Sequence, residues 1–531
     1  MIMKNKGFHF LKYFLLVYMG VTVVFPLLSL LFTVGWSDVV EVFTSARFFP
    51  MLKNSLVTTI SATVISVALA FALALAINRS NIKFKSVFVV LFTLPMLIPS
   101  ISHGMGLVLL LGDNGILTNL LGVNIGLYGY KGIIMGSVMY SFPVAFLMFN
   151  DSLRYEDYTI YEAGKVLGMS KWNQFTTITM PAMNRTIISA VLTVFTLIFT
   201  DYGVPLMTGG TVMTLPVYMY REVIGMMNFS GGAVVGMVLL LPTAAAFLID
   251  LRKNSSAANS GTVSQPYKID ENKTRDTLVY IAFTVIVILM CLPIAAFICL
   301  SFVRLYPIDM TPSLEPLKKL FANKIGIYLI NSLAVAMLTA LIGTALSYFS
   351  AYVAVRNHKK TFITKMAHIL SMLPLAIPGV VLGLSFLLTF QKLPVYGTIF
   401  ILVMVNIVHF YSSPYLLAFN SLSKFNSNLE DVARTLGISK MNMLFSVYIP
   451  STMSTIIEMY SYFFVNSMIT ISAVSFLINF RTMPLALLIP QLESQSFIEG
   501  TALVSLLILA INVAEKSMAF FFKRHMEETT E

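Results

Sequence analysis

The sequence has little charge, which excludes most classes of soluble protein. Only 11% of its 531 residues are charged, and 57% are hydrophobic, whereas about a quarter of the residues in a soluble globular protein are charged. The net charge of +11 comes from basic residues in short loops between apolar runs, so membrane topology explains it better than nucleic-acid binding. The composition therefore predicts a protein that crosses a membrane many times.

Two further absences narrow the class. Cys291 and Cys299 are the only cysteines, in one apolar segment. Eight residues along a helix span about 12 Å, beyond the reach of a disulfide, so no disulfide framework is expected. The phosphate-binding pattern G-x-x-x-x-G-K-[S/T] occurs nowhere in the chain. We therefore expect no ATP hydrolysis, and no catalytic or metal site, on this chain.

The apolar runs predict an all-α polytopic membrane protein with about 12 transmembrane helices. Each run is long enough to cross about 30 Å of hydrocarbon. The first follows a basic N-terminus and is too long for a signal peptide. The runs form two groups of six: 13–34, 51–78, 86–111, 132–150, 182–206 and 232–251, then 278–303, 327–355, 362–390, 395–419, 452–478 and 501–522.

The loops predict the orientation of the chain. Basic residues gather in the N-terminus, in the loop at 79–85 and in its counterpart at 356–365. Lysine and arginine mark the cytoplasmic side of short loops, and an even number of spans places these loops together, so both termini are expected in the cytoplasm. The loop at 304–326 departs from this trend, since it is basic but is placed outside.

The two groups of spans are repeats. Asn54-Ser55-Leu56 recurs as Asn331-Ser332-Leu333, and Leu94-Pro95-x-x-Ile98-Pro99 recurs as Leu373-Pro374-x-x-Ile377-Pro378. Six spans in each half make the repeats parallel. We predict a first unit at 1–251, a flexible cytoplasmic linker at 252–277, rich in Ser, Asn and Lys, and a second unit at 278–531.

A polar insert is also written twice. The first insert is Tyr161–Met183 and the second insert is Glu430–Thr452, and both fall on the predicted cytoplasmic face. They match in register at a glycine, a serine, a lysine, an asparagine and a proline. This pattern predicts a short helix, a sharp bend at the glycine and a second helix. A single copy would fit an interfacial helix that packs on its own half, but two matched copies favour a soluble partner with two equivalent sites.

The inserts resemble the EAA loop of bacterial ABC importer permeases. The first copy reads Glu162-Ala163-Gly164, then Gly168, and ends Ile178-x-Met180-Pro181. The second reads Asp431-Val432-Ala433, then Gly437, and ends Val447-x-Ile449-Pro450. Gly164, Val432, Met180 and Ile449 are conservative departures from the family pattern. Most such permeases carry one unit and pair, so this chain resembles the fused, two-unit kind.

The resemblance implies a type I ABC importer permease fold in a bacterial inner membrane. It implies two cytoplasmic ATPase subunits, which carry ATP and Mg²⁺, and an extracytoplasmic solute-binding protein as partners, with no nucleic acid and no cofactor on this chain. The residues expected to contact the ATPases are Glu162, Ala163, Gly164, Gly168, Ser170, Lys171, Asp431, Val432, Ala433, Gly437, Ser439 and Lys440.

Several polar or helix-breaking residues inside the spans are candidates for a solute pathway, because ionisable groups in a membrane are often functional. Each also has an ordinary structural explanation, such as a hydrogen bond between helices or a position near the interface. These candidates are His103, His409, Pro95, Pro99, Pro374, Pro378, Asp201 and Glu458.

The solute and one competing class stay open at this stage. Fused permeases of this kind serve ferric iron, thiamine, polyamine and 2-aminoethylphosphonate uptake, and the segment from Thr200 to Tyr218 looks most like the phosphonate branch. The alternative is an ion-coupled secondary transporter with six-plus-six parallel repeats. Its usual charged loop between the second and third spans is short here, which favours the importer. A membrane scaffold or receptor has no support beyond hydrophobicity.

Overall fold

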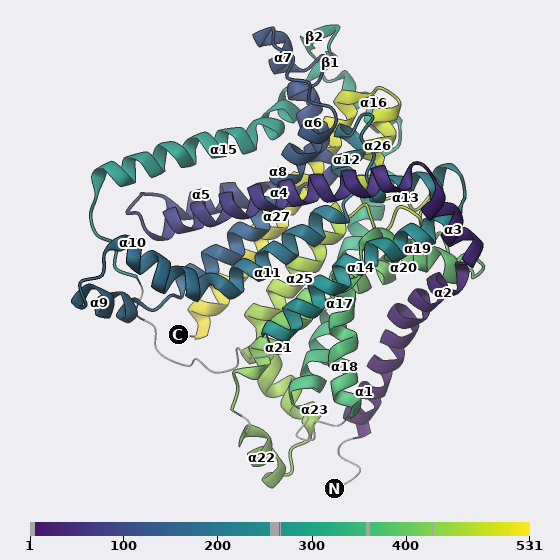
Figure 1. Cartoon of the computed structure of the whole chain (residues 1–531). Helices are drawn as coiled ribbons and strands as arrows, with labels where there is room; N and C mark the ends of the chain where they lie inside the picture. Colours follow the sequence, from purple (N-terminus) through teal and green to yellow (C-terminus); the bar gives the residue numbers. More distant parts are fainter. Residues whose placement is uncertain (1–5, 255–264, 266, 357–361, 427, 531) are drawn as a thin grey trace. The chain divides into compact units, whose positions relative to one another are not determined.

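The computed structural model describes residues 6–254, 265, 267–356, 362–426 and 428–530 (Figure 1). Parts of the predicted basic N-terminus, linker and 356–365 loop lie outside the described residues. The described part is almost entirely helical, as predicted, apart from one short antiparallel hairpin of β1 (Val303–Leu305) and β2 (Asp309–Pro312). The chain packs into two compact units. Each unit holds most of one sequence repeat together with the first span of the other repeat.

Unit 2 comprises Thr44–Tyr218 and Leu241–Ser313, so it holds most of the first repeat and the first span of the second. Its helices are α4 (Phe48–Asn78), α5 (Lys85–Thr93), η3 (Leu94–Leu97), α6 (Ser100–Leu111), α7 (Ile116–Leu121), α8 (Tyr130–Arg154), α9 (Tyr158–Val166), α10 (Lys171–Gln174), η4 (Phe175–Thr179), α11 (Met180–Phe199), α12 (Gly203–Thr208) and α15 (Lys273–Ser301).

Unit 1 comprises Met1–Phe43, Met219–Leu240 and Leu314–Glu531. Its helices are α1 (Lys6–Met19), η2 (Gly20–Val24), α2 (Phe25–Thr33), α3 (Trp36–Thr44), α16 (Glu315–Ala322), α17 (Ile325–Val355), α18 (Phe362–Met372), η5 (Leu373–Ala376), α19 (Gly379–Phe390), α20 (Ile399–Phe410), α21 (Ser412–Ser423), α22 (Asn428–Thr435), α23 (Lys440–Met443), η6 (Leu444–Tyr448), α24 (Ile449–Ser451), α25 (Met453–Ile469), α26 (Leu485–Ser494) and α27 (Ile498–Thr530). Two helices, α13 (Leu215–Gly225) and α14 (Phe229–Asn254), run from one unit into the other.

The described residues hold nine helices long and apolar enough to span a membrane, or up to eleven if two bent pairs each count as one span. The predicted spans 86–111 and 362–390 are broken rather than straight. In both, a 3₁₀ turn carries the first repeated proline and the second proline is the N-cap of the helix that follows, and the bend between α18 and α19 is 110°. Proline lacks the N–H that would continue the helix, so the repeated Pro95/Pro99 and Pro374/Pro378 pairs cause these breaks.

The predicted spans 182–206 and 452–478 both end early. Helix α11 stops at Phe199 and α25 stops at Ile469, and the chain then turns before the next helix. Hydrophobicity continues through these turns because they are buried against other helices, so an apolar run alone could not show where each helix ends.

The repeated Asn-Ser pairs make matching hydrogen bonds to the backbone in both units. Ser55 at the start of α4 accepts a hydrogen bond of 2.7 Å from the backbone N–H of Leu215, and Ser332 in α17 accepts one of 2.6 Å from Leu485. The preceding asparagine of each pair donates to a backbone carbonyl just upstream, at 3.0 and 2.8 Å. Each pair thereby fixes the start of a helix, α13 or α26, whose first N–H groups have no partner within the helix itself.

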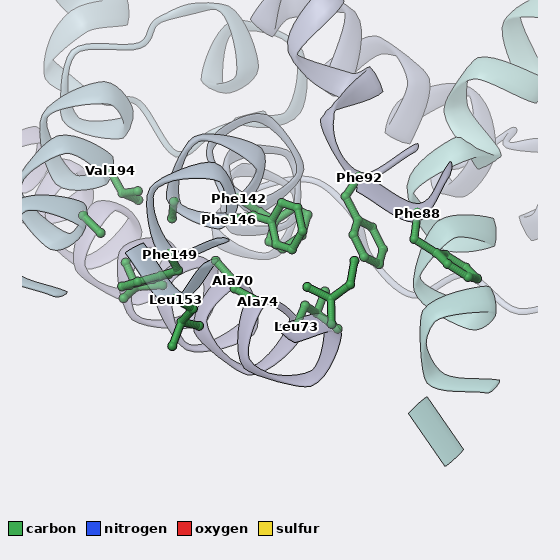
Figure 2. Close-up of a cluster of buried hydrophobic side chains, with 14 of the residues drawn as sticks. Ala70, Leu73, Ala74, Phe88, Phe92, Phe142, Phe146, Phe149, Leu153 and Val194 are labelled. Atoms are coloured by element: carbon green, nitrogen blue, oxygen red, sulfur yellow. The ribbon is translucent and has the colours of Figure 1, made fainter. Parts of the chain in front are cut away.

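Aromatic side chains form the core of unit 2 (Figure 2). Phe92 of α5 lies 5.2 Å from the ring of Phe146 in α8 and 5.2 Å from that of Phe283 in α15. Ala70 and Ala74 are fully buried on α4, where small side chains allow α8 to approach closely. Helix α15, which belongs by sequence to the second repeat, is therefore packed into the core built by the first.

Candidate functional site

Both inserts fold into a helix, a tight bend and a second helix, as the sequence predicts. In the first insert, Gly168 follows the end of α9 with φ +74°, and in the second, Gly437 follows the end of α22 with φ +68°. The N–H of the residue after each glycine bonds to the carbonyl five residues back, at 3.0 and 2.8 Å. The glycine N–H bonds three residues back, at 3.0 and 3.2 Å. This pattern is a Schellman motif, which requires a left-handed residue at the helix end.

The repeated serine starts the second helix of each insert. Ser170 is the N-cap of α10 and accepts a hydrogen bond of 3.2 Å from the backbone N–H of Asn173. Ser439 caps α23 in the same way, with Asn442 at 3.2 Å. The serine hydroxyl accepts a hydrogen bond from a first-turn N–H that has no partner within the helix. The matched Gly and Ser positions are thus explained by the bend itself, so they set the shape of the insert and not the chemistry of its surface.

The repeated proline follows a π-helical turn in both inserts. Pro181 lies just after η4, and Pro450 lies just after η6. A wider i→i+5 turn accommodates the N–H that proline lacks. In the first insert, α10, η4 and α11 run on as one apolar stretch from Lys171 to Phe199, so Pro181 lies inside a continuous helical stretch. In the second insert, α24 ends at Ser451, just after Pro450, and α25 begins at Met453.

Large apolar side chains stand exposed at the bend of each insert. Leu167 is 79% exposed, and Leu436, at the same place in the second insert, is 69% exposed. Val166 and Trp172 extend the first surface, and Val432 and Ile438 extend the second. We call these two sets of residues the crests. Exposed apolar groups that gather at one place mark binding surfaces, and they are the strongest feature of the inserts.

The acidic residues of the EAA-like motif form different ion pairs in the two copies. Glu162 forms an ion pair of 3.2 Å with Lys268, whereas Asp431 pairs with Arg434 of its own helix at 3.4 Å. The next two positions agree in burial: Ala163 and Val432 are exposed, and Gly164 and Ala433 are buried. A Cβ at Gly164 would lie 3.2 Å from the sulfur of a neighbouring methionine, so alanine there would require that side chain to shift.

The two matched lysines also differ. Lys171 is exposed and lies 3.4 Å from Asp270. Lys440 instead donates to the carbonyl of Arg356 at 3.3 Å and lies 4.3 Å from the ring centre of Phe8. Burial holds the pKa of Lys440 below its ordinary value. At this matched position the first copy therefore offers a solvent-exposed cation and the second a half-buried one.

Sequence reasoning missed a buried ionic cluster beneath each insert. In unit 1, Arg356 at the end of α17 pairs with Glu430 at 3.0 Å and lies 4.8 Å from the ring centre of Tyr448. The phenol of Tyr448 donates to Glu430 at 2.5 Å. The side chains of Arg356 and Glu430 are only 5% and 9% exposed. The cluster ties α22 to α17.

Unit 2 builds the same cluster from different positions. Arg79 at the end of α4 pairs with Glu156 at 2.5 Å and donates to the hydroxyl of Tyr161 at 3.0 Å. Tyr161 also bonds to Glu156. Burial and the neighbouring Glu156 carboxylate raise the pKa of the Tyr161 phenol, so it stays protonated. Tyr161 occupies the register position of Glu430, whereas the acid of this cluster, Glu156, comes from before the insert. An alignment of the two repeats does not reveal the cluster. Only the arginine follows the same span in both copies, whereas the acid and the phenol come from unmatched positions.

The pathway candidates do not form one cluster. His103 lies in the first turn of α6 with its ring 5.9 Å from that of Tyr140, and His409 of α20 lies beside Gly379 at the start of α19. Each unit thus has a histidine in or beside the helix that follows the proline break, buried at His103 and half-buried at His409. Asp201 accepts hydrogen bonds from Ser100 and Val204, at 2.6 and 3.0 Å.

Asp201 also borders a small cavity in unit 2, lined by hydroxyl-bearing and apolar side chains in equal number. Glu458 lies elsewhere and pairs with Lys523 of α27, at an exposed position. Within the described residues, no group of three or more His, Cys, Asp or Glu side chains could hold a metal ion. Both cysteines are free.

Comparison with known proteins identifies the family. The model of the binding-protein-dependent transport system inner membrane component matches residues 66–251 and 343–527. A putative ferric transport system permease protein of Haemophilus influenzae is 24% identical over 84% of this chain and 73% of its own length. The ferric transport system permease protein of Actinobacillus pleuropneumoniae is 24% identical over 89% of this chain and 71% of its own.

A thiamine transport system permease protein of Salmonella typhimurium is 22% identical over 61% of each chain. The family model fits once in each repeat, as the internal duplication requires. It overturns the alternative of an ion-coupled secondary transporter. The chain belongs to the family of binding-protein-dependent transport system inner membrane components, as a multi-pass permease that carries two family units in one polypeptide.

Proposed function

We propose that this permease is the translocation subunit of an ATP-driven importer and that its two inserts are the docking sites for two ATPase subunits. The observation that carries the proposal is the repetition of an exposed apolar crest on a rigid bend, with Leu167 and Leu436 at matched places. A chain with no phosphate-binding loop needs a partner to hydrolyse ATP. Two equivalent crests on one chain suit two copies of the same partner.

The geometry suits transmission of force as well as binding. Each bend is fixed by a Schellman motif and a serine cap, and each insert is tied to a long helix by a buried arginine. The second helix of the first insert continues without interruption into α11. A partner that pushes on the crest would therefore move a span and not merely a loop. On this proposal the inserts lie in the cytoplasm, together with both termini.

The test of docking is substitution of the crests. The double variant Leu167→Ser/Leu436→Ser removes apolar surface without touching either bend, so it is expected to insert normally and to lose co-purification of the ATPase. Tyr155→Ser is the matched control, since Tyr155 is 73% exposed beside the first insert but outside its crest. Wild-type ATPase recovery with the double variant would contradict the docking role. Robust ATP hydrolysis by the purified chain alone would contradict the division of labour.

We propose ferric iron as the solute. Two relatives that match more than four fifths of this chain are named for ferric transport, and a thiamine permease matches with lower coverage. 2-Aminoethylphosphonate, which the segment after Thr200 resembles, and polyamines are the competing solutes. Uptake of labelled ferric iron, thiamine, spermidine and 2-aminoethylphosphonate by cells with and without this gene separates them. The binding protein encoded nearest the gene is the probe for affinity, and its preference for another solute would overturn the iron assignment.

A further inference from the structure

The segment that precedes α15 lies against the first insert. We call residues 265 and 267–276 the clasp. The backbone N–H of Tyr158, the first residue of α9, donates to the carbonyl of Gln265 at 3.0 Å. The side chains of Lys268 and Asp270 reach the insert as well, Lys268 to Glu162 at 3.2 Å and Asp270 to Lys171 at 3.4 Å. The clasp thus contacts both helices of the insert.

Tyr267 is the centre of the clasp. Its ring lies under the guanidinium of Arg79, with 3.2 Å from Cζ to the ring centre, and edge-on to the rings of Tyr158 and Tyr161, each 5.1 Å away. A desolvated cation over an aromatic ring attracts more strongly than an exposed ion pair. Tyr267 therefore contributes more to the clasp than its surface ion pairs do, and it joins the buried cluster of Arg79 to α9.

The far end of the clasp leads directly into α15. Asp276 in the first turn of α15 accepts a hydrogen bond of 3.1 Å from the backbone N–H of Asn81, just after α4. Arg275 donates to the carbonyl of Asp270 at 2.9 Å, which folds the clasp back on itself. The start of α15, the end of α4 and the insert are therefore one connected junction.

Unit 1 has a counterpart of this junction. Phe8 of α1 is buried, with its ring 5.9 Å from that of Tyr352 in α17, and Lys440 of the second insert lies 4.3 Å from its centre. Tyr352 donates to the carbonyl of Lys440 at 2.7 Å. In both units an aromatic residue near the start of the exchanged span contacts a cation. Phe8 of α1 contacts Lys440 of the second insert, and Tyr267, just before α15, contacts Arg79 at the end of α4.

We infer that Tyr267 is a positioning residue that couples the first insert to α15, and that Phe8 couples the second insert to α1. Each insert belongs by sequence to one repeat and each of these spans to the other. Movement of an insert is then passed directly to a span of the opposite repeat. The inference rests on the proposed function, since the inserts must receive a push for the coupling to matter.

The contact is testable without any ATPase. A zero-length carbodiimide joins an amine to a carboxylate only when the two touch, so the purified full chain should give a Lys268–Glu162 cross-linked peptide. Tyr267→Ala should lower its yield several-fold, because the exposed ion pairs alone hold the clasp weakly. Tyr267→Phe keeps the ring and should retain the yield. Absence of the cross-link in the wild type would overturn the clasp, whatever the ATPase does.

Coupling is tested in the reconstituted permease–ATPase complex as solute imported per ATP hydrolysed. Tyr267→Ala should lower this ratio several-fold while the ATPase stays bound, and Tyr267→Phe should restore it. Asp270→Lys, at an exposed position facing Lys165 and Lys171, gives a second variant that leaves the buried cluster intact and should also lower the ratio. Glu271→Ala, exposed in the same segment, is the control and should keep the wild-type ratio.

A wild-type ratio in both Tyr267→Ala and Asp270→Lys would overturn the coupling role. If the wild-type permease bound no ATPase but still gave the cross-link, the proposed function would fail while the clasp stood as a contact. A loss of uptake in Tyr267→Phe equal to that in Tyr267→Ala would also count against the inference, because the ring and not the hydroxyl carries the contact with Arg79.

Discussion

Replacing Glu430 by glutamine should loosen the second insert by a predictable amount. Glu430→Gln keeps an acceptor for the phenol of Tyr448 but leaves the guanidinium of Arg356 buried without its carboxylate. Removing one partner of a buried ion pair costs about 3–5 kcal/mol. We take about 3 kcal/mol, the low end, because neither Nε nor Nη2 of the guanidinium makes a hydrogen bond within the described residues, although Nε lies 3.0 Å from the carboxylate. At about 1.4 kcal/mol per tenfold, the open state of the insert should rise on the order of 100-fold.

Trypsin reports this opening, because Arg434 lies in α22 itself. When opening is fast relative to cleavage, the cleavage rate follows the population of the open state, so the variant should be cut at Arg434 far faster than the wild type. The double variant Arg356→Met/Glu430→Gln removes the stranded charge and should recover most of the protection. Cleavage of Glu430→Gln at the wild-type rate, or of the double variant as fast as the single, would refute the reasoning.

Other predictions follow from single contacts. Gly168→Ala forces an alanine to φ +74°, which costs about 1 kcal/mol, and should weaken ATPase binding in a pull-down without preventing membrane insertion. Ser55→Ala removes the acceptor for the N–H of Leu215 and should lower the thermal midpoint, since an unmade buried hydrogen bond costs about 1–3 kcal/mol. Gly106→Val should abolish folding, measured as monodisperse protein in detergent, because even a Cβ there would lie 2.5 Å from the proline of α15. Gly20→Val, where a Cβ meets nothing within 4 Å, is the matched control.

The inserts were the most predictable part of the fold. Gly168, Ser170 and Pro181 are residue types that start, end or interrupt helices through local backbone effects. Their repetition in the sequence therefore predicts the bend that the structure shows. Their role in contacting a partner stays a prediction. The same local reasoning identified the paired prolines as helix breakers, although it did not predict a turn as sharp as 110° between α18 and α19.

The buried clusters could not be predicted, because their members come from distant parts of the chain. Arg79 and Glu156 follow different spans, and in unit 2 the acid and phenol sit at other positions than in unit 1. A loop arginine reads as a topology marker in sequence, and only packing shows that it is buried. The clasp was hidden for a related reason, since a stretch rich in Ser, Asn and Lys carries no apolar periodicity and reads as a free linker.

The exchange of first spans between the repeats affects whether the two repeats could be encoded as separate proteins. Phe283 of α15 completes the aromatic core that α5 and α8 build, so a fragment ending at residue 251 would expose that core to lipid or to aggregation. A protein cut between its repeats should survive only when both pieces are made together, as in a domain-swapped dimer whose subunits complete one another. When both repeats are on one polypeptide, every molecule contains both first spans. A mutation that split the gene between the repeats would therefore leave two fragments that each lack a span.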